Sequence, residues 1–216
     1  MDKLDYARGI ESVGIMKTQH IPYNNVHEVA HWSPLWTVDK RDVGVEEWIH
    51  ARIPTSIIFG SVEYKRAYDE LRREFEVKVP VRERVTADGN LLVNAGMDLM
   101  WDAVIGTAIT AFSNANAYLG VGDSSTAAAA SQTDLQASSN KTRKAMNATY
   151  PDQPANSQIR FQSDFGSSDA NYQWLEVAAF NASSAGTMLN RLVPGGGLGT
   201  KASGATWTLT LVITLS

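Results

Sequence analysis

The sequence predicts a mainly β protein: an antiparallel β-sandwich or jelly-roll-like domain with one inserted helix, preceded by an extended N-terminal arm with short helices. Charge is concentrated at the beginning, since residues 1–90 carry 13 of the 19 Lys and Arg, 15 of the 23 Asp and Glu, and all four His. Short apolar runs separated by Gly, Asn, Ser and Pro fill the rest, and the last run places an apolar residue at every second position. We therefore expect a charged arm over residues 1–85 and a β-rich domain over residues 86–216.

The arm is predicted from its prolines and from one amphipathic segment. Prolines divide it into pieces of roughly 12 to 25 residues, which leave room only for short helices and extended links. The best helix spans residues 61–77, where Ser61 suits the N-cap and Glu63 the first turn. Its apolar stripe consists of Val62, Tyr64, Tyr68, Leu71 and Phe75.

The strands of the β-rich domain are predicted from alternation and from short apolar bursts. In residues 206–216, Trp207, Leu209 and Leu211 share one face while Thr208 and Thr210 share the other, as in a half-buried antiparallel strand. Further strands are expected at Tyr118–Val121, Gln158–Phe165, Tyr172–Phe180 and Met188–Val193.

One helix interrupts the strands, over residues 94–106. Gly106 suits its C-terminal end, and we expect Asp98 and Asp102, spaced i, i+4, to lie on its solvent face. Its apolar face is expected to consist of Met97, Met100, Trp101, Val104 and Ile105.

Composition bounds the kinds of function. The net charge of −4 and the pI near 5.6 give no broad basic field, so we expect neither nucleic acid nor an anionic membrane as a partner. The chain has no cysteine, which excludes disulfides, thiolate zinc sites and cysteine nucleophiles. No signal-peptide pattern or membrane span is recognised, and we expect a soluble protein made in a cytoplasm.

Large apolar side chains in the arm are the candidate interface residues. The arm has too little neighbouring sequence to bury them within itself, so they are expected to dock elsewhere. Two surfaces compete for them, a partner subunit and residues 91–216 of the same chain. The candidates are Trp32, Trp36, Trp48, Ile57 and Phe59, with Ile58 beside them.

His27, Glu28 and His31 form an H-E-x-x-H pattern, the spacing of a zinc hydrolase. Pro34 follows closely, too few residues precede the pattern for a supporting sheet, and the third ligand would have to come from the region of Glu46 to His50. We therefore interpret the pattern as a short helix with its histidines on a solvated or interfacial face. We expect no enzyme activity, no cofactor and no metal.

From Ala117 to Ser138, a short apolar strand and a glycine–aspartate turn are followed by a long run of Ala, Ser and Thr with two isolated anchors, Thr133 and Leu135. Small side chains permit close backbone approach, and hydroxyls can satisfy backbone groups locally. We expect Leu135 to pin this loop to the sheet, the alternative being a flexible surface loop.

These elements, taken in order, resemble those of many virion proteins of tailed bacteriophages. In such proteins an N-L-x-x-N-A-G segment opens a helix, a strand ends in G-x-G, and a small-residue loop closes on a leucine. An aromatic strand, an E-x-G/A-x-F-N segment, a leucine-rich strand and a W-T-L-T strand follow. The resemblance covers about residues 85–216. The matching segments are Asn90–Gly96, Tyr118–Gly122, Ser124–Leu135, Gln158–Phe165, Glu176–Asn181, Met188–Leu192 and Trp207–Leu215.

The resemblance implies a structural protein of a phage particle, located in the virion after synthesis in the host cytoplasm. A capsid decoration or cement protein that binds the major capsid protein, and is homo-oligomeric within the particle, is the first expectation. The alternative is a minor tail, baseplate or fibre-attachment protein. Two further hypotheses are a carbohydrate- or receptor-binding module, with Tyr172 and Trp174 as the stacking residues, and the zinc metalloprotease.

Overall fold

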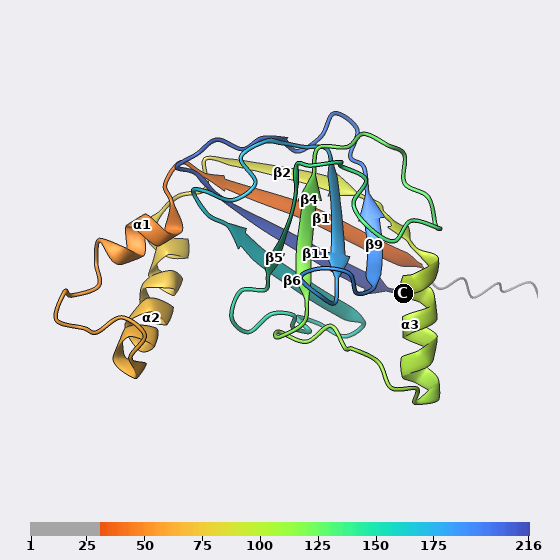
Figure 1. Cartoon of the computed structure of the whole chain (residues 1–216), viewed down its shortest axis with the longest axis horizontal. Coiled ribbons are helices and arrows are strands. Elements are labelled where there is room, and N and C mark those ends of the chain that lie inside the picture. Colours follow the sequence, from red (N-terminus) through yellow and green to blue (C-terminus); the bar gives the residue numbers. More distant parts are fainter. Residues whose placement is uncertain (1–30) are drawn as a thin grey trace, which may run out of the picture. The chain divides into compact units, whose positions relative to one another are not determined.

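The computed structural model of the chain describes residues 31–216, which form one compact unit (Figure 1). Within this unit the protein is mainly β, with two principal antiparallel sheets and three helices, which confirms the predicted fold class. The part of the predicted arm that comprises residues 1–30 lies outside the described residues.

The first sheet has four strands in the order β2-β1-β11-β6. All its neighbours are antiparallel, and β11 lies centrally because it pairs along its length with both β1 and β6. Alternation along β11 buries Trp207, Leu209 and Leu211 as predicted. The strands are β1 (Trp32–Arg41), β2 (Glu83–Asp88), β6 (Gln158–Phe165) and β11 (Thr206–Leu215).

The second sheet has five strands in the order β3-β9-β8-β4-β5 and is also antiparallel. A separate two-stranded pair joins β10 (Gly199–Thr200) to β7 (Gln173–Trp174). The single strand predicted over residues 172–180 is therefore broken at Leu175. The five strands are β3 (Leu91–Leu92), β4 (Tyr118–Gly122), β5 (Lys141–Ala145), β8 (Glu176–Phe180) and β9 (Met188–Leu192).

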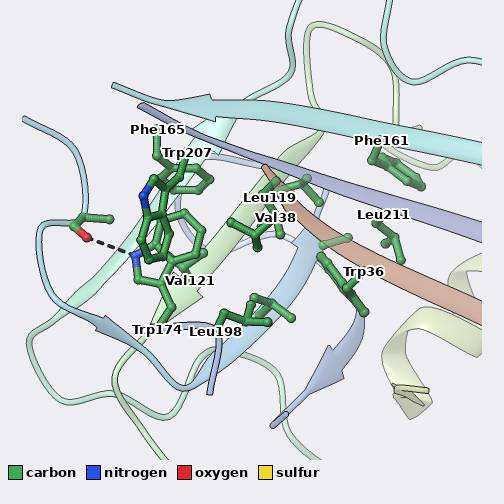
Figure 2. Packing of buried hydrophobic residues seen from close by; sticks show 14 of the residues in the cluster. Trp36, Val38, Leu119, Val121, Phe161, Phe165, Trp174, Leu198, Trp207 and Leu211 are labelled. Atoms are coloured by element: carbon green, nitrogen blue, oxygen red, sulfur yellow. Dashed lines mark hydrogen bonds between the residues drawn. The ribbon is translucent and has the colours of Figure 1, made fainter. Parts of the chain in front are cut away.

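The main core lies between the two sheets, whose strands cross one another as in a β-sandwich (Figures 1 and 2). An aromatic group closes one end of it, where Trp174 packs edge-on against Phe165 and Trp207 with ring centroids 4.7 and 4.9 Å apart. Trp174 Nε1 donates to the carbonyl of Ala170 at 3.0 Å, so its polar atom is satisfied inside the core. The aliphatic core members come from both sheets and include Val38, Leu119, Val121, Val177, Leu189 and Leu211.

Residues 32–41 are a sheet strand, and the predicted arm is wrong for this part of the chain. Trp36 and Val38 are completely buried in the main core. Pro34 is tolerated within β1 because its backbone groups face the β2 side of the strand. In an antiparallel sheet the N–H and C=O of one residue point to the same neighbour, and the Pro34 carbonyl accepts from Gly89 N, just beyond the end of β2. The N–H that proline lacks would therefore not have bonded to β11. The predicted boundary at residue 85 falls inside β2, whereas the compact unit begins at His31.

Helices α1 (Val45–His50) and α2 (Val62–Lys78) pack on each other at the Arg41 end of β1. Their own small core consists of Val45, Ile49, Phe75 and Val79. The predicted helix over residues 61–77 is confirmed, and Ser61 Oγ accepts from Tyr64 N at 3.1 Å as its N-cap. The pair is tied to the first sheet by polar contacts, including Val45 N to Thr206 Oγ1 at 2.7 Å and Arg41 Nε to the Val79 carbonyl at 3.1 Å.

Helix α3 (Asn94–Ile105) confirms the predicted inserted helix, which ends at Gly106. It lies against β9, and Gly96 makes this possible because a Cβ there would stand 2.3 Å from the Leu189 carbonyl oxygen. The helix begins near the other end of β1, where Trp32 Nε1 donates to Asn90 Oδ1 at 3.1 Å. Helices α2 and α3 are thus attached at opposite ends of the ten-residue strand β1.

Candidate functional site: a clamped loop and two exposed apolar surfaces

Residues 123–140, which we call the clamped loop, cross the outer face of the five-stranded sheet. Leu135 is buried there against Val93, Phe180 and Met188, so the prediction that it pins the loop to the sheet is confirmed. The small residues before it allow the backbone to follow the sheet closely. The alternative of a loop without fixed contacts does not fit this packing.

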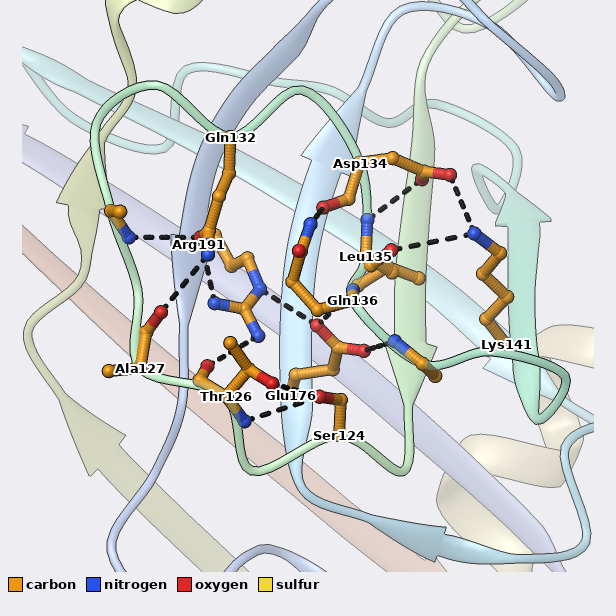
Figure 3. A network of polar contacts seen from close by, with 12 residues as sticks. Ser124, Thr126, Ala127, Gln132, Asp134, Leu135, Gln136, Lys141, Glu176 and Arg191 are labelled. Atoms are coloured by element: carbon orange, nitrogen blue, oxygen red, sulfur yellow. Dashed lines mark hydrogen bonds and ion pairs between the residues drawn. The ribbon is translucent and has the colours of Figure 1, made fainter.

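Glu176, on β8, holds the loop backbone through two hydrogen bonds (Figure 3). Its carboxylate accepts from Gln136 N at 2.9 Å and from Ala137 N at 2.7 Å. Gly122, on the neighbouring strand β4, leaves room for this carboxylate, because a Cβ there would stand 2.4 Å from Glu176 Oε1. The glutamate therefore supplies acceptors that a loop without regular structure needs for its buried N–H groups.

Arg191, on β9, completes the clamp. Its Nε donates to Glu176 Oε2 at 2.7 Å, and both side chains are fully buried. Its other nitrogens donate to the Thr126 carbonyl and to Gln132 Oε1, each at 2.9 Å, so the guanidinium binds the first half of the loop while Glu176 binds the second (Figure 3). A buried ion pair is tolerated when the remaining donors and acceptors are satisfied, as they are here. The pair fixes the course of the loop.

Asp134 adds a more exposed tie between the loop and β5. It accepts from Lys141 Nζ and from Arg143 Nη2, each at 2.8 Å. Partial burial alone would raise the pKa of Asp134, but the hydrogen bonds from the two cations outweigh it, and the pKa lies below its ordinary value. The loop is therefore anchored at both ends by charge as well as by Leu135.

An apolar stripe on α3, which we call the α3 face, is exposed. Trp101, Val104 and Ile105 are 67%, 73% and 75% exposed, and Met97 lies one turn before Trp101. Of the predicted apolar face of this helix, Met100 packs against the main core. Side chains of this size gathered on one exposed helix face are typical of an interaction surface.

A second exposed apolar surface, which we call the aromatic hollow, lies where the 58–60 turn meets α2. Phe59 is 80% exposed and its ring packs against Tyr64 with centroids 4.8 Å apart, and Tyr64 stacks in turn on Tyr68. The hollow has a volume of about 420 Å³. Its lining includes three charged groups, Glu46, Lys65 and Asp69.

Tyr68 is held by a carboxylate at the edge of the aromatic hollow. Its hydroxyl donates to Glu46 Oε1 at 2.7 Å. Burial, together with this hydrogen bond, raises the pKa of Tyr68, so the phenol stays protonated and remains a donor. The hollow therefore has a fixed aromatic wall.

The predicted interface residues divide into buried and exposed ones. Trp36 is completely buried in the chain's own core, Trp32 packs against that core, and Trp48 packs edge-on against Phe75 at 5.7 Å. The tryptophans therefore dock on their own chain. Ile57 is half-buried, and Phe59 remains exposed as an interface residue requires.

The H-E-x-x-H pattern lies largely outside the described residues, which include His31 but neither His27 nor Glu28. His31 exchanges backbone hydrogen bonds with Ser216, its N–H at 2.6 Å and its carbonyl at 3.1 Å, which extends the ladder between β1 and β11. Among residues 31–216, no group of three or more His, Asp or Glu side chains is arranged to hold a metal ion.

Tyr172 and Trp174 do not form a sugar-stacking surface. Trp174 is fully buried, and the hydroxyl of the half-buried Tyr172 lies 3.0 Å from Thr142 Oγ1 and 3.2 Å from the Val121 carbonyl.

Asp98 and Asp102 line an open hollow of about 410 Å³ together with Asn181, whose side chain is itself paired with the backbone of Thr110 and Thr187.

Lys201 is a buried titratable group that the sequence did not single out. Its Nζ donates to the Gly166 carbonyl at 2.6 Å and to Asn171 Oδ1 at 2.8 Å. Burial lowers the pKa of Lys201 to about 8. Its side chain is only 1% exposed, so a solute cannot reach the amine. We therefore assign Lys201 the role of holding the turn to which it donates.

The buried charges were also missed by sequence reasoning. Glu176 begins the otherwise apolar strand β8, and Arg191 follows Asn190 as the one charged residue of β9, so a single charge in a short strand is the only local signal that they share. Within the described part of the chain, no helix has both the length and the apolar character that crossing a membrane requires.

Comparison with models of known protein families and with curated proteins found no match.

Proposed function

We propose that this chain is a structural, non-enzymatic protein of a tailed bacteriophage particle, a capsid decoration protein that binds the major capsid protein and stabilises the head. The observation that carries the proposal is that the segments of the resemblance form one packing unit. They coincide with the start of α3, with β4, β6, β8, β9 and β11, and with the clamped loop.

The contacts among these segments give the resemblance a physical meaning. The glutamate of Glu176–Asn181 binds the loop whose leucine, Leu135, packs on the phenylalanine of the same segment. The G-x-G strand leaves room for that glutamate, and the glycine of Asn90–Gly96 lets α3 approach β9. Because these residues depend on one another, we expect a protein that has one of these segments to have the others as well. Their joint occurrence supports descent of the whole β-rich domain from phage virion proteins of this kind.

The exposed surfaces suit a decoration protein. The α3 face and the aromatic hollow offer apolar contact area at opposite ends of β1. A protein present in many copies on a lattice needs only modest affinity at each contact, because simultaneous engagement multiplies their effect. Contacts that are individually weak are therefore sufficient for a cement role.

Purified particles of the phage that encodes the chain provide the test. The proposal predicts copies in the tens to hundreds per particle by quantitative gel or mass spectrometry, and labelling of the head by antibody in electron microscopy. A few copies with label on the tail would instead support a minor tail or baseplate protein. Absence from washed particles would refute a virion role altogether.

A further inference from the structure

We propose that two copies of this chain associate through the outer edge of strand β2, so that their four-stranded sheets join into one continuous antiparallel sheet across a two-fold axis. The contact is a property of the chain alone, so the inference goes beyond the proposed function and does not rest on it. It can be tested on the isolated protein.

Strand β2 is an edge of the first sheet, and within residues 31–216 its only paired neighbour is β1 (Figure 1). The opposite edge of the sheet, β6, is covered by its own chain, because Asn147 N donates to the Gln162 carbonyl at 2.8 Å and Asp152 exchanges backbone hydrogen bonds with Arg160. An edge that presents a row of unpaired N–H and C=O groups is a template for a further strand. The β2 edge therefore differs from the β6 edge in lacking such a cover among the described residues.

Backbone N–H and C=O groups point away from β1 at Arg84, Thr86 and Asp88. The register follows from the next residue, Gly89, whose N–H donates to the Pro34 carbonyl at 3.2 Å and so faces β1. Because this direction alternates along an antiparallel strand, every second residue before Gly89 faces β1 and the residues between them face outward. The side chains of these three outward-facing residues are exposed. Both their backbone and their side chains can thus meet a second copy.

The sequence of β2 is complementary to itself when two copies run antiparallel about Thr86. Thr86 then lies opposite Thr86 of the second copy, and Arg84 of each copy lies opposite Asp88 of the other. Opposite charges directly across two strands are favourable. The Nε and Nη2 atoms of Arg84 already bind Asp39 of their own chain, at 2.5 and 2.8 Å, which leaves Nη1 for the second carboxylate.

The face of β2 toward the core is matched in the same register. Val85 and Ala87 alternate with the outward-facing residues and pack against the main core. In a pair centred on Thr86, Val85 of one copy lies opposite Ala87 of the other, so apolar side chains meet apolar ones. Charges on one face and apolar residues on the other therefore favour the same arrangement.

Charge also selects this register over the other antiparallel ones. Hydrogen bonds between the two edges form again only when the register changes by two residues, because the outward direction alternates. Such changes place Arg84 opposite Arg84, Asp88 opposite Asp88, or one of them opposite Thr86, and like charges directly opposite are destabilising. Charged edge strands commonly prevent pairing, whereas here the two signs are arranged so that they favour it. The contact is isologous, since the same patch of both copies forms it.

The absence of cysteine permits a direct test with the full chain. Thr86→Cys places one thiol at the two-fold axis, where the Cα atoms of a hydrogen-bonded pair lie about 5.5 Å apart and a disulfide can form. The purified variant is oxidised mildly, and the rate of formation of the disulfide-linked dimer is measured. Val77→Cys is the control, because Val77 is 86% exposed on α2. The proposal predicts that Thr86→Cys links at least about tenfold faster than Val77→Cys.

A charge reversal in the Thr86→Cys chain identifies the register. Asp88→Arg brings like charges together at both ends of the contact and leaves the pair of Arg84 with Asp39 in place, so linkage should slow at least about tenfold. Asp69→Arg is the matched control, because it makes the same change of net charge at an exposed position of α2, and it should leave the rate unchanged. Circular dichroism spectra of all variants show whether each one is folded.

Amide hydrogen exchange of the unsubstituted chain gives a second readout. The N–H of Thr86 points outward, so it should exchange freely in dilute solution and become protected as the protein concentration rises. The N–H of Ala87 faces β1 and should be protected at every concentration. This difference between neighbouring residues is specific to pairing at the β2 edge.

Three outcomes would overturn the inference. Linkage of Thr86→Cys no faster than that of Val77→Cys would show that copies do not meet at this edge, and insensitivity of the rate to Asp88→Arg would show that they do not meet in this register. Protection of the Thr86 N–H at every concentration would assign the edge to residues 1–30 of the same chain. The proposed function fails separately, by absence of the chain from particles, so the two failures are distinguishable.

Discussion

Removing the charge of Glu176 is expected to destabilise the protein strongly. The Glu176 carboxylate accepts from Gln136 N, Ala137 N and Arg191 Nε, in hydrogen bonds that are buried or half-buried. The amide of Glu176→Gln has only one acceptor oxygen for these three donors. At least one N–H then loses its acceptor, at a cost of about 1–3 kcal/mol. Arg191 is left as an uncompensated charge, and breaking a buried pair in this way costs about 3–5 kcal/mol.

We therefore expect the free energy of unfolding to fall by about 3–5 kcal/mol, and the midpoint of thermal unfolding to fall by on the order of 10 °C. Urea unfolding followed by circular dichroism measures the first quantity. Amide hydrogen exchange at Gln136 and Ala137 should accelerate more than exchange in β11, because the loop loses its clamp first. Asp152→Asn is the control, since its pair with Arg160 is about one-third exposed and should contribute less than about 1 kcal/mol.

A double-mutant cycle isolates the ion pair. Arg191→Met together with Glu176→Gln removes both charges, so the double variant should lose at least about 1 kcal/mol less than the sum of the single losses. A loss below about 1 kcal/mol for Glu176→Gln, or strictly additive effects in the cycle, would refute the account of the clamp.

Three further predictions concern the core, α3 and a buried lysine. Trp36→Ala should lower the free energy of unfolding by about 3–5 kcal/mol, because Trp36 is fully buried, whereas Trp101→Ala should change it by less than about 1 kcal/mol; equal effects in urea unfolding would contradict the assignment of residues 32–41 to the core. Gly96→Ala should be destabilising by about 1–3 kcal/mol, since the clash with the Leu189 carbonyl outweighs a helix-propensity gain of about 1 kcal/mol; a rise in thermal midpoint would show that α3 lies farther from β9. Lys201 has a folded-state pKa of about 8, below its ordinary 10.5, so between these pH values the unfolded chain binds more protons and the free energy of unfolding rises with pH. Lys201→Met should lack this rise, and a wild-type minus variant difference that is flat from pH 8 to 10.5 would disprove the shift.

The β-rich half of the fold was predictable because its signals are local. β6 matches its predicted bounds, and from Leu209 to Thr214 the burial of β11 alternates as its sequence alternates in polarity, whereas Thr206 and Thr208 are buried as well. The bounds of α2 follow from Ser61 and a helical stripe, and those of α3 from an apolar face and Gly106. Each of these elements is recognisable without knowledge of its partner.

The first strand was missed because its partners are far away in the sequence. β1 pairs with β11, and its charges made it look like part of a solvated arm. Those charges are instead matched across strands, Asp39 with Arg84 at 2.8 Å and Lys40 with Glu83 at 3.0 Å, in register. A high density of charge thus does not exclude a core strand when a neighbouring strand carries the opposite signs.

The candidate site was predictable only in part. Leu135, the apolar stripe of α3 and Phe59 were identified from sequence, because apolar residues among small or polar ones are visible. The pairing of Glu176 with Arg191 was not, because it depends on the register between β8 and β9 and on a loop lying over both. Sequence left a partner subunit and residues 91–216 of the same chain as competing surfaces for the tryptophans of the arm, because the pairing of β1 with β11 has no local signal.

An electron cryomicroscopy reconstruction of the phage particle would test the central claim most directly. The account predicts density for this chain on the head surface, in contact with the major capsid protein. A head lattice without such density, or density for the chain confined to the tail, would contradict it.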